Sequence, residues 1–239
     1  MNSKDVFIAY LAKRGIECND LQFAELIDLM LSTLAKNEEF NLTAITNQDD
    51  FEDKMLIDSA LGMYDVDLTD KKVIDVGTGA GFPGMVLYTL NKKMNLTLLD
   101  STAKKIQHLK SYCQERGYDN IKFVSARVEK FARENSGTYD YAYARAVSHL
   151  RVLIEIIMPL LKVGGTLIAL KGRGYEDEIM QSKDLLNKVG CKIDHIYEDV
   201  LPISEEKRYL IYIKKTKPTP DKFPRDYAII KKEVEKSKK

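Results

Sequence analysis

Val73-Ile-Asp-Val-Gly-Thr-Gly-Ala-Gly-Phe-Pro-Gly-Met85 joins a short apolar run to a turn that holds four glycines. Glycine has no Cβ atom, so such a turn can bend sharply and a ligand can approach its backbone closely. A second apolar run ends in Asp100, twenty-three positions after Gly77. A carboxylate at that place can accept hydrogen bonds from the hydroxyls of a ribose. The stretch therefore predicts a strand, a turn and a helix that bind a nucleoside-containing cofactor, although a purely structural turn would use the same glycines.

The spacing of the glycines indicates which cofactor this is. A dinucleotide fingerprint reads G-x-G-x-x-G, and its third glycine would stand where this chain has Phe82. Residues 73–91 contain neither the G-K-[ST] of a phosphate-binding loop nor any Lys or Arg. The pattern instead resembles motif I of class I S-adenosylmethionine (SAM) methyltransferases, with Asp100 as the ribose-binding acid. The resemblance implies SAM as the cofactor and disfavours a dehydrogenase.

From residue 72 onward, short apolar runs alternate with amphipathic segments, which is typical of βα units. We expect strands over 72–76, 95–99, 121–125, 138–144, 165–171, 191–198 and 207–214. Helices fit between the first six strands. Residues 199–206, which include Pro202, are too few for a crossover, so the last two strands should pair antiparallel. The expected fold is α/β: a Rossmann-like sheet of seven strands, the last antiparallel, as in class I SAM methyltransferases.

The chain divides into three parts by its patterning. Residues 1–64 contain helical patterns over 4–14, 19–36 and 48–63 and are expected to form an N-terminal helical cap on one sheet edge. Residues 65–215 form the SAM-binding methyltransferase domain. Residues 216–239 are predicted to be a basic C-terminal tail leaving the domain. From Lys214 onward the net charge is +6, which suits either a solvated, partly disordered tail or an element facing a polyanion such as RNA.

The composition indicates the cellular compartment and argues against disulfides, a membrane span and a metal site. The three cysteines are far apart and lack C-x-x-C spacing, which argues against disulfides and zinc and favours a reducing, cytoplasmic location. No signal peptide is recognised, and the most apolar stretch, Val152–Leu161, is too short to span a bilayer. The three histidines are isolated, so no metal site is expected.

Ligands of doubly wound sheets bind at the carboxyl ends of the strands. The residues expected to bind the cofactor by this rule are Gly77, Thr78, Gly79, Gly81, Phe82, Asp100, Ser101, Val128, Glu129 and Arg145. The glycine turn would receive the methionyl portion of SAM, Glu129 or nearby backbone the adenine amino edge, and Val128 the adenine ring. Arg145 could hold the cofactor carboxylate or a substrate phosphate.

Each of these assignments has a plainer alternative. Glu129 could be an ordinary acid at a helix N-terminus, Arg145 a member of a surface ion pair, and Ser101 a helix cap. Asp58 stands among apolar neighbours on the third expected helix, and a buried structural hydrogen bond is slightly favoured for it over a functional role. No residue is singled out as a catalytic acid or base.

Seven motifs in one order resemble a particular methyltransferase family. They are Asn41–Ile45, Ile57–Ser59, Asp75–Gly84, Leu98–Ser101 with Lys104-Lys105, Ala144–Val147, Leu170–Gly172 and Phe223–Arg225. Together they look like the GidB (RsmG) family of bacterial 16S rRNA guanine-N7 methyltransferases, over residues 38–225. The resemblance implies methyl transfer from SAM to N7 of a guanine, position 527 in the standard rRNA numbering, in the small ribosomal subunit or an assembly intermediate.

The resemblance also implies where RNA binds and what remains open. Asn41, Lys171, Arg208 and Arg225 match family positions that would contact the substrate. Three departures concern RNA docking: Met55 stands where the family commonly has His, Tyr143 replaces a smaller residue, and the usual Gly-Thr-Pro after Arg225 is missing. The protein is expected to be a monomer. The alternative is a SAM-dependent methyltransferase acting on a small molecule or protein, which would leave the basic tail without a purpose.

Overall fold

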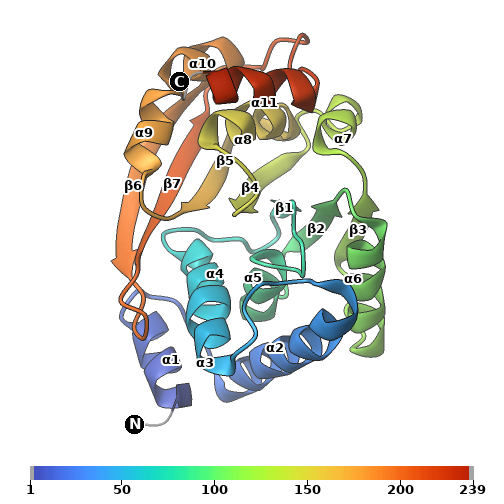
Figure 1. Cartoon of the computed structure of the whole chain (residues 1–239), viewed down its shortest axis with the longest axis vertical. Coiled ribbons are helices and arrows are strands. Elements are labelled where there is room, and N and C mark those ends of the chain that lie inside the picture. Colours follow the sequence, from blue (N-terminus) through green and yellow to red (C-terminus); the bar gives the residue numbers. More distant parts are fainter. Residues whose placement is uncertain (1–2, 237–239) are drawn as a thin grey trace.

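The computed structural model describes residues 3–236 as one seven-stranded sheet with helices on both faces (Figure 1). The strand order is β3-β2-β1-β4-β5-β7-β6. β7 runs antiparallel to both β5 and β6, and the other neighbouring pairs are parallel. The predicted α/β fold with an antiparallel last strand is confirmed.

The strands lie close to where the apolar runs predict them. Their bounds are β1 Lys72–Val76, β2 Asn95–Asp100, β3 Ile121–Ser125, β4 Tyr139–Arg145, β5 Leu161–Lys171, β6 Cys191–Val200 and β7 Lys207–Lys215. The helices that follow β1 to β5 are α5 Gly84–Leu90, α6 Ala103–Glu115, α7 Val128–Glu134, α8 Leu150–Ile157 continued by the 3₁₀ turn η3 Met158–Leu160, and the pair α9 Tyr175–Met180 and α10 Lys183–Val189.

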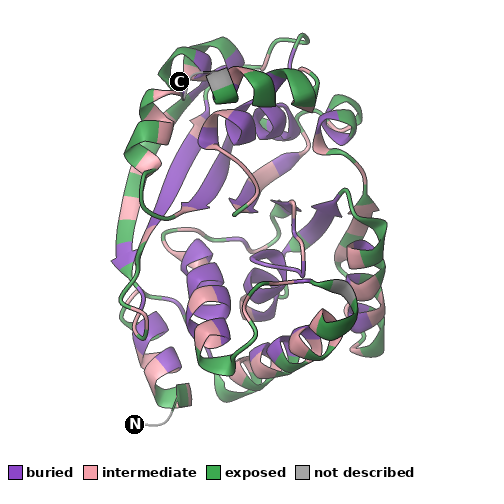
Figure 2. Ribbon diagram, viewed as in Figure 1, coloured by how far each residue is buried: buried purple, intermediate pink, exposed green. Residues whose placement is uncertain are grey.

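Two apolar cores lie on opposite faces of the sheet, since successive strand side chains point to opposite faces. In β1, for example, Val73 belongs to one core and Ile74 to the other. The first core is closed by the N-terminal helices, α5 and α6, and the second by α7, α8 and α10. Figure 2 shows the buried residues concentrated in the strands and on the helix faces that meet them.

The N-terminal helices share their core with the sheet. They are α1 Ser3–Ala12, α2 Asp20–Phe40, and a continuous helical segment made of α3 Gln48–Phe51, the π-helix η1 Glu52–Ile57, α4 Asp58–Ala60 and η2 Leu61–Met63. Asn19 and Gln22 form a reciprocal capping box that begins α2. Asn41 ends α2 in the left-handed region at φ 50°. The segment from Asn41 to α3 runs to the carboxyl edge of the sheet.

The C-terminal part differs from the expectation. The backbone N–H groups of Thr216 and Lys217 donate to the carbonyl oxygen of Gly190, which returns the chain to the domain. Helix α11, Tyr227–Lys236, then packs against α8 with Ile230 and Val234 buried. The prediction of a tail that leaves the domain was wrong, because this apolar pair lies on one face of a helix within a charged sequence. Within residues 3–236, no helix has the length and apolarity needed to cross a membrane.

Candidate functional site

A pocket of about 520 Å³ lies at the carboxyl ends of β1, β2 and β4. Its lining comprises Leu42, Thr43, Ala44, Ile45, Met55, Gly77, Thr78, Gly79, Ala80, Phe82, Asp100, Ser101, Lys105, Arg127, Val128, Glu129, Arg145, Ala146, Val147, Ile156 and Tyr227. Of the ten residues predicted to bind the cofactor, nine line this pocket, and Gly81 lies beside it within the turn. The pocket therefore gathers residues from eight separate segments at the edge where doubly wound sheets bind ligands.

The glycine turn between β1 and α5 is held by one buried carboxylate. Oδ2 of Asp75 accepts hydrogen bonds from the Thr78 hydroxyl at 2.6 Å and from the Gly84 N–H at 2.8 Å. Gly77 and Gly79 both have positive φ, which favours glycine. A Cβ on Gly77 would lie 2.6 Å from Val147, whereas the nearest atom to a Cβ on Gly79 would be the Gly77 carbonyl oxygen, at 3.9 Å. Gly79 thus leaves room for a ligand against the backbone.

Burial gives Asp75 a pH-dependent effect on stability. Desolvation raises its pKa from 3.8 to about 6. Since the folded protein keeps a proton that the unfolded chain releases between about pH 4 and 6, ionising Asp75 lowers the free energy of unfolding across that window. Asp75→Asn keeps an oxygen for the two hydrogen bonds and removes the titration. We expect the variant to gain about 3 kcal/mol relative to the unmutated protein between pH 4 and 7, and nothing more above it. Urea unfolding over this pH range measures the gain; a flat difference would contradict the prediction.

Asp100 ends β2 and faces the pocket. One carboxylate oxygen accepts the Gly79 N–H at 3.0 Å and the other accepts the Thr102 N–H at 2.8 Å. A carboxylate oxygen has more than one lone pair, so both oxygens can still accept hydrogen bonds from a ligand. Ser101 is exposed, and Thr102, not Ser101, is the residue that precedes helix α6. These two hydrogen bonds fix the Asp100 carboxylate against the glycine turn.

The far wall of the pocket is formed at the start of α7. Val128 and Glu129 are the first two residues of that helix, and Glu129 is 9% exposed. Arg127 lies over the ring of Tyr227, with its guanidinium carbon 5.7 Å from the ring centroid. Tyr227 belongs to α11, so the C-terminal helix contributes to the pocket. An apolar side chain next to a carboxylate suits the face and the amino edge of an adenine ring.

Arg145, the last residue of β4, is hydrogen-bonded through both terminal nitrogens of its guanidinium group. Its Nη1 donates to the Lys54 carbonyl at 2.9 Å and lies 3.4 Å from Oδ2 of Asp58, while Nη2 lies 2.9 Å from the thioether sulfur of Met55. Its buried Nε has no hydrogen-bond partner among the described residues. Nε and Nη2 together form a fork that suits a carboxylate, and a thioether is a weak acceptor. An unpartnered buried donor beside a pocket is the feature expected where an anionic group binds.

The four residues predicted to bind substrate lie outside this pocket lining. Asn41 directly precedes the pocket segment 42–45, and Nε of Arg208 lies 3.3 Å from Asp58. Lys171, at the end of β5, donates to the Ser148 carbonyl and to Glu178, both at 2.7 Å. Arg225 forms ion pairs with Glu155 of α8 and Glu233 of α11. The structure thus brings Arg208 near Arg145 and places Arg225 in a separate network.

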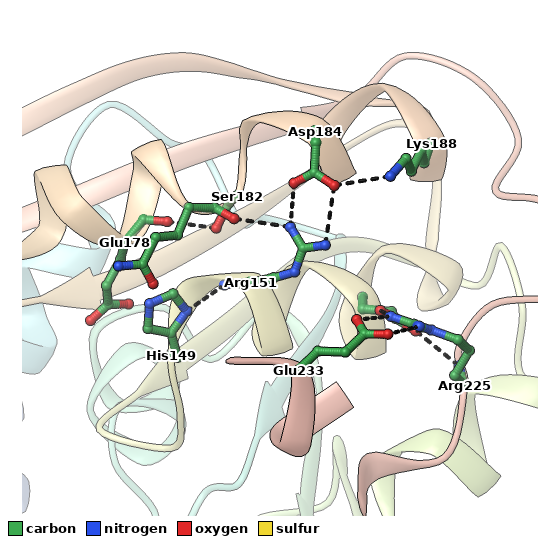
Figure 3. A network of polar contacts seen from close by, with 10 residues as sticks. His149, Arg151, Glu178, Ser182, Asp184, Lys188, Arg225 and Glu233 are labelled. Atoms are coloured by element: carbon green, nitrogen blue, oxygen red, sulfur yellow. Dashed lines mark hydrogen bonds and ion pairs between the residues drawn. The ribbon is translucent and has the colours of Figure 1, made fainter. Parts of the chain in front are cut away.

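Figure 3 shows that separate network, in which Arg225 faces Glu233 and Arg151 faces Asp184. Sequence reasoning did not find the roles of residues 42–45, Met55, Lys105, Arg127 or Tyr227 in the pocket. The sequence motif Asn41–Ile45 could have indicated the role of residues 42–45. Among residues 3–236, no group of three or more His, Cys, Asp or Glu is arranged to hold a metal ion.

Two of the departures noted in the sequence have clear places in the structure. Met55 is buried against Arg145 and lines the pocket. Tyr143 is fully buried, and its hydroxyl donates to the Gly62 carbonyl at 2.8 Å. A smaller residue at 143 would leave a cavity between β4 and η2. Tyr143 therefore fixes the helical segment 48–63 against the sheet.

The strand order, the antiparallel last strand and the pocket around the glycine turn and Asp100 define a class I, Rossmann-like methyltransferase, and SAM is the cofactor of that class. A solved SAM-dependent methyltransferase from Aquifex aeolicus has the same fold, with a TM-score of 0.51, 16% identity, and coverage of 77% of this chain and 98% of that chain. The family model described as rRNA small subunit methyltransferase G matches residues 22–205, and this chain belongs to that family, GidB.

Curated relatives agree with the family model over nearly their whole length. The ribosomal RNA small subunit methyltransferase G of Alkaliphilus metalliredigens is 39% identical over 228 residues, which cover 94% of this chain and 95% of the relative. The protein of the same name from Fusobacterium nucleatum is 36% identical over 226 residues, which cover 95% and 97%. The resemblance read from the seven motifs is confirmed at the level of the family.

Proposed function

We propose that this protein transfers the methyl group of SAM to N7 of a guanine in 16S rRNA, the guanine at position 527 in the standard numbering. The membership in the GidB family over residues 22–205 carries this proposal. The relatives' names state that they methylate the RNA of the small ribosomal subunit. We propose further that the protein works as a monomer in the cytoplasm, on the small subunit or an assembly intermediate.

The residues that would hold the cofactor fit its chemical parts. The carboxylate of Asp100 would accept hydrogen bonds from the ribose hydroxyls, and Gly79 would leave space for the methionyl portion. Arg145, whose Nε has no hydrogen-bond partner among the described residues, would bind the carboxylate of the methionyl portion. Val128 packs on the adenine ring, and Glu129 accepts from its amino group. When bound, SAM supplies an electrophilic methyl group on its sulfonium.

Methylation of the substrate needs no acid–base catalysis by the protein. Guanine N7 carries a lone pair and no proton, so its methylation needs no general base. The described lining of the pocket accordingly contains no histidine, and its two carboxylates are assigned here to the cofactor. What the chain contributes is alignment of N7 with the methyl group and sulfur, which can supply about 7–11 kcal/mol. Asn41, Lys171 and Arg208 would contact the RNA around the pocket.

The RNA is expected to present its guanine outside a regular helix. The major groove of an RNA helix is deep and narrow, so N7 is reached best in a loop or an unpaired segment. We therefore expect the reaction to depend on the folded structure of the RNA and on ribosomal proteins that maintain it. Free 16S rRNA and assembled small subunits should differ as substrates.

Labelled SAM offered with purified 16S rRNA and with small subunits tests the function. We expect label on one guanine N7, mapped to position 527 by chain cleavage at N7-methylguanine, and a rate at least about hundredfold above that of an Asp100→Ala variant. The absence of N7-methylguanine from both substrates would reject the proposal. Label on protein or on small molecules alone would support the alternative class of substrate.

A further inference from the structure

The helical segment before the sheet changes its hydrogen-bond register beside Arg145. The backbone N–H of Asp58 donates to the carbonyl oxygens of Asp53 and Met55 and passes over that of Lys54. In a regular α-helix, Asp58 would donate to Lys54, four residues before it. The Lys54 carbonyl instead accepts from Nη1 of Arg145. The π-helix η1 thus supplies one acceptor to Arg145, and π-helical turns are frequent at functional sites.

Asp58 lies directly after that π-helix and between two arginines. Its Oδ2 is 3.4 Å from Nη1 of Arg145 on β4, and its Oδ1 is 3.3 Å from Nε of Arg208 on β7. The Asp58 side chain is 6% exposed, and the Arg145 and Arg208 side chains are 14% and 15% exposed. One buried carboxylate is therefore the shared counter-ion of two guanidinium groups that come from distant parts of the chain.

Two of these three side chains contain a buried polar atom that makes no hydrogen bond to the described residues. Oδ1 of Asp58 and Nε of Arg145 are both buried without a hydrogen-bond partner among the described residues. Burial raises the pKa of Asp58, and the two guanidinium groups oppose that shift. Native proteins rarely leave such groups unsatisfied, because each costs about 1–3 kcal/mol. A cost of this kind is retained where the arrangement serves a ligand.

We propose that Asp58 is a positioning residue of the methyl-transfer site, whose carboxylate holds Arg145 toward the cofactor and Arg208 toward the RNA. It acts on the side of Arg145 opposite the Nε and Nη2 fork, and so turns that fork to the pocket. Because Arg145 and Arg208 share Asp58 as a counter-ion, a ligand that binds one arginine changes the ion pair between Asp58 and the other. This inference rests on the proposed function, in which Arg145 binds the cofactor carboxylate.

The test compares two ligands that differ at the group Arg145 would bind. S-adenosylhomocysteine carries the amino-acid carboxylate, and 5′-methylthioadenosine has the same adenosine thioether without it. In calorimetry with Asp58→Asn, we expect the affinity for S-adenosylhomocysteine to fall about tenfold or more, which corresponds to about 1.4 kcal/mol or more. The affinity for 5′-methylthioadenosine should stay within about twofold. A change in overall structure would weaken both ligands alike and would overturn the proposal.

A matched control exists in β6, an edge strand of the sheet. Asp199 is also a buried aspartate paired with an arginine, Arg14, and it lies outside the pocket lining. Asp199→Asn should leave both affinities unchanged. Equal affinity of Asp58→Asn and the unmutated protein for S-adenosylhomocysteine would also reject the positioning role.

The double variant keeps the test decisive if Asp58→Asn does not fold. Asp58→Asn with Arg145→Gln removes both charges of the buried pair, while Arg208 keeps its ion pair with Glu206 at 2.8 Å. Since Asp58 acts through Arg145, this variant should bind S-adenosylhomocysteine as Arg145→Gln alone does. A further loss in the double variant would show that Asp58 acts independently.

The outcomes also separate this inference from the proposed function. If the unmutated protein methylates guanine N7 and Asp58→Asn keeps its ligand preference, only the positioning role fails. If the unmutated protein methylates no RNA but the selective loss of affinity appears, the positioning role stands and the RNA substrate is wrong. The readout of ligand preference does not depend on RNA.

Discussion

Replacing Asp100 with alanine should lower the affinity for S-adenosylhomocysteine about hundredfold or more and reduce methylation in proportion. The variant lacks the carboxylate that would accept two hydrogen bonds from the ribose. Hydrogen bonds to a charged group contribute about 1.5–3 kcal/mol each. The Gly79 N–H and the Thr102 N–H would lose their acceptors at the same time. The glycine turn would then be less well fixed where the methionyl portion binds.

Two controls separate ligand binding from folding in that experiment. Asp100→Asn keeps one acceptor oxygen and should lose less affinity than the alanine variant. Asp140 is a partly exposed aspartate at the opposite end of the sheet that pairs with Lys162. Asp140→Ala should bind S-adenosylhomocysteine normally. If Asp100→Ala kept its ligand affinity and its turnover, the assignment of the pocket to SAM would fall.

The strands could be predicted from the sequence because buried parallel strands are continuous apolar runs bounded by turns. The one strand whose start was misplaced by several residues shows the limit of that signal. β5 begins at Leu161, and its residues 162–164 are exposed and include Gly164. Leu161 pairs with Tyr139 of β4, and residues 162–164 lie at the register shift that follows. This pairing is a tertiary contact that leaves no apolar pattern in the sequence.

The candidate site was predictable where its residues sit at strand ends. Gly77, Asp100 and Arg145 each follow an apolar run, so the rule for doubly wound sheets finds them. Tyr227 and Met55 enter the pocket from helices that pack from outside, and no local pattern reports such a contact. Asp58 could be recognised as a buried acid, but its partners Arg145 and Arg208 lie far along the chain.

The family resemblance and the structure indicate different roles for Arg225. The family resemblance assigns it to the RNA, and the side chain is instead held by two carboxylates. Its Nε and Nη2 donate at 2.7 Å to the two oxygens of Glu155, which is 0% exposed, and both Nη atoms donate to Glu233. This pairing fastens the segment before α11 to helix α8. We therefore expect the main effect of Arg225 to be on stability.

Arg225→Ala should lower the free energy of unfolding by about 3–5 kcal/mol, because it leaves the carboxylate of Glu155 buried without a cation. The midpoint of thermal unfolding should fall by about 10 °C. Combining it with Glu155→Gln removes the stranded charge and should recover much of the loss. Glu233→Gln, which alters the exposed partner, should cost less than about 1 kcal/mol. An Arg225→Ala protein as stable as the unmutated one, yet unable to methylate RNA, would return Arg225 to the RNA-binding surface.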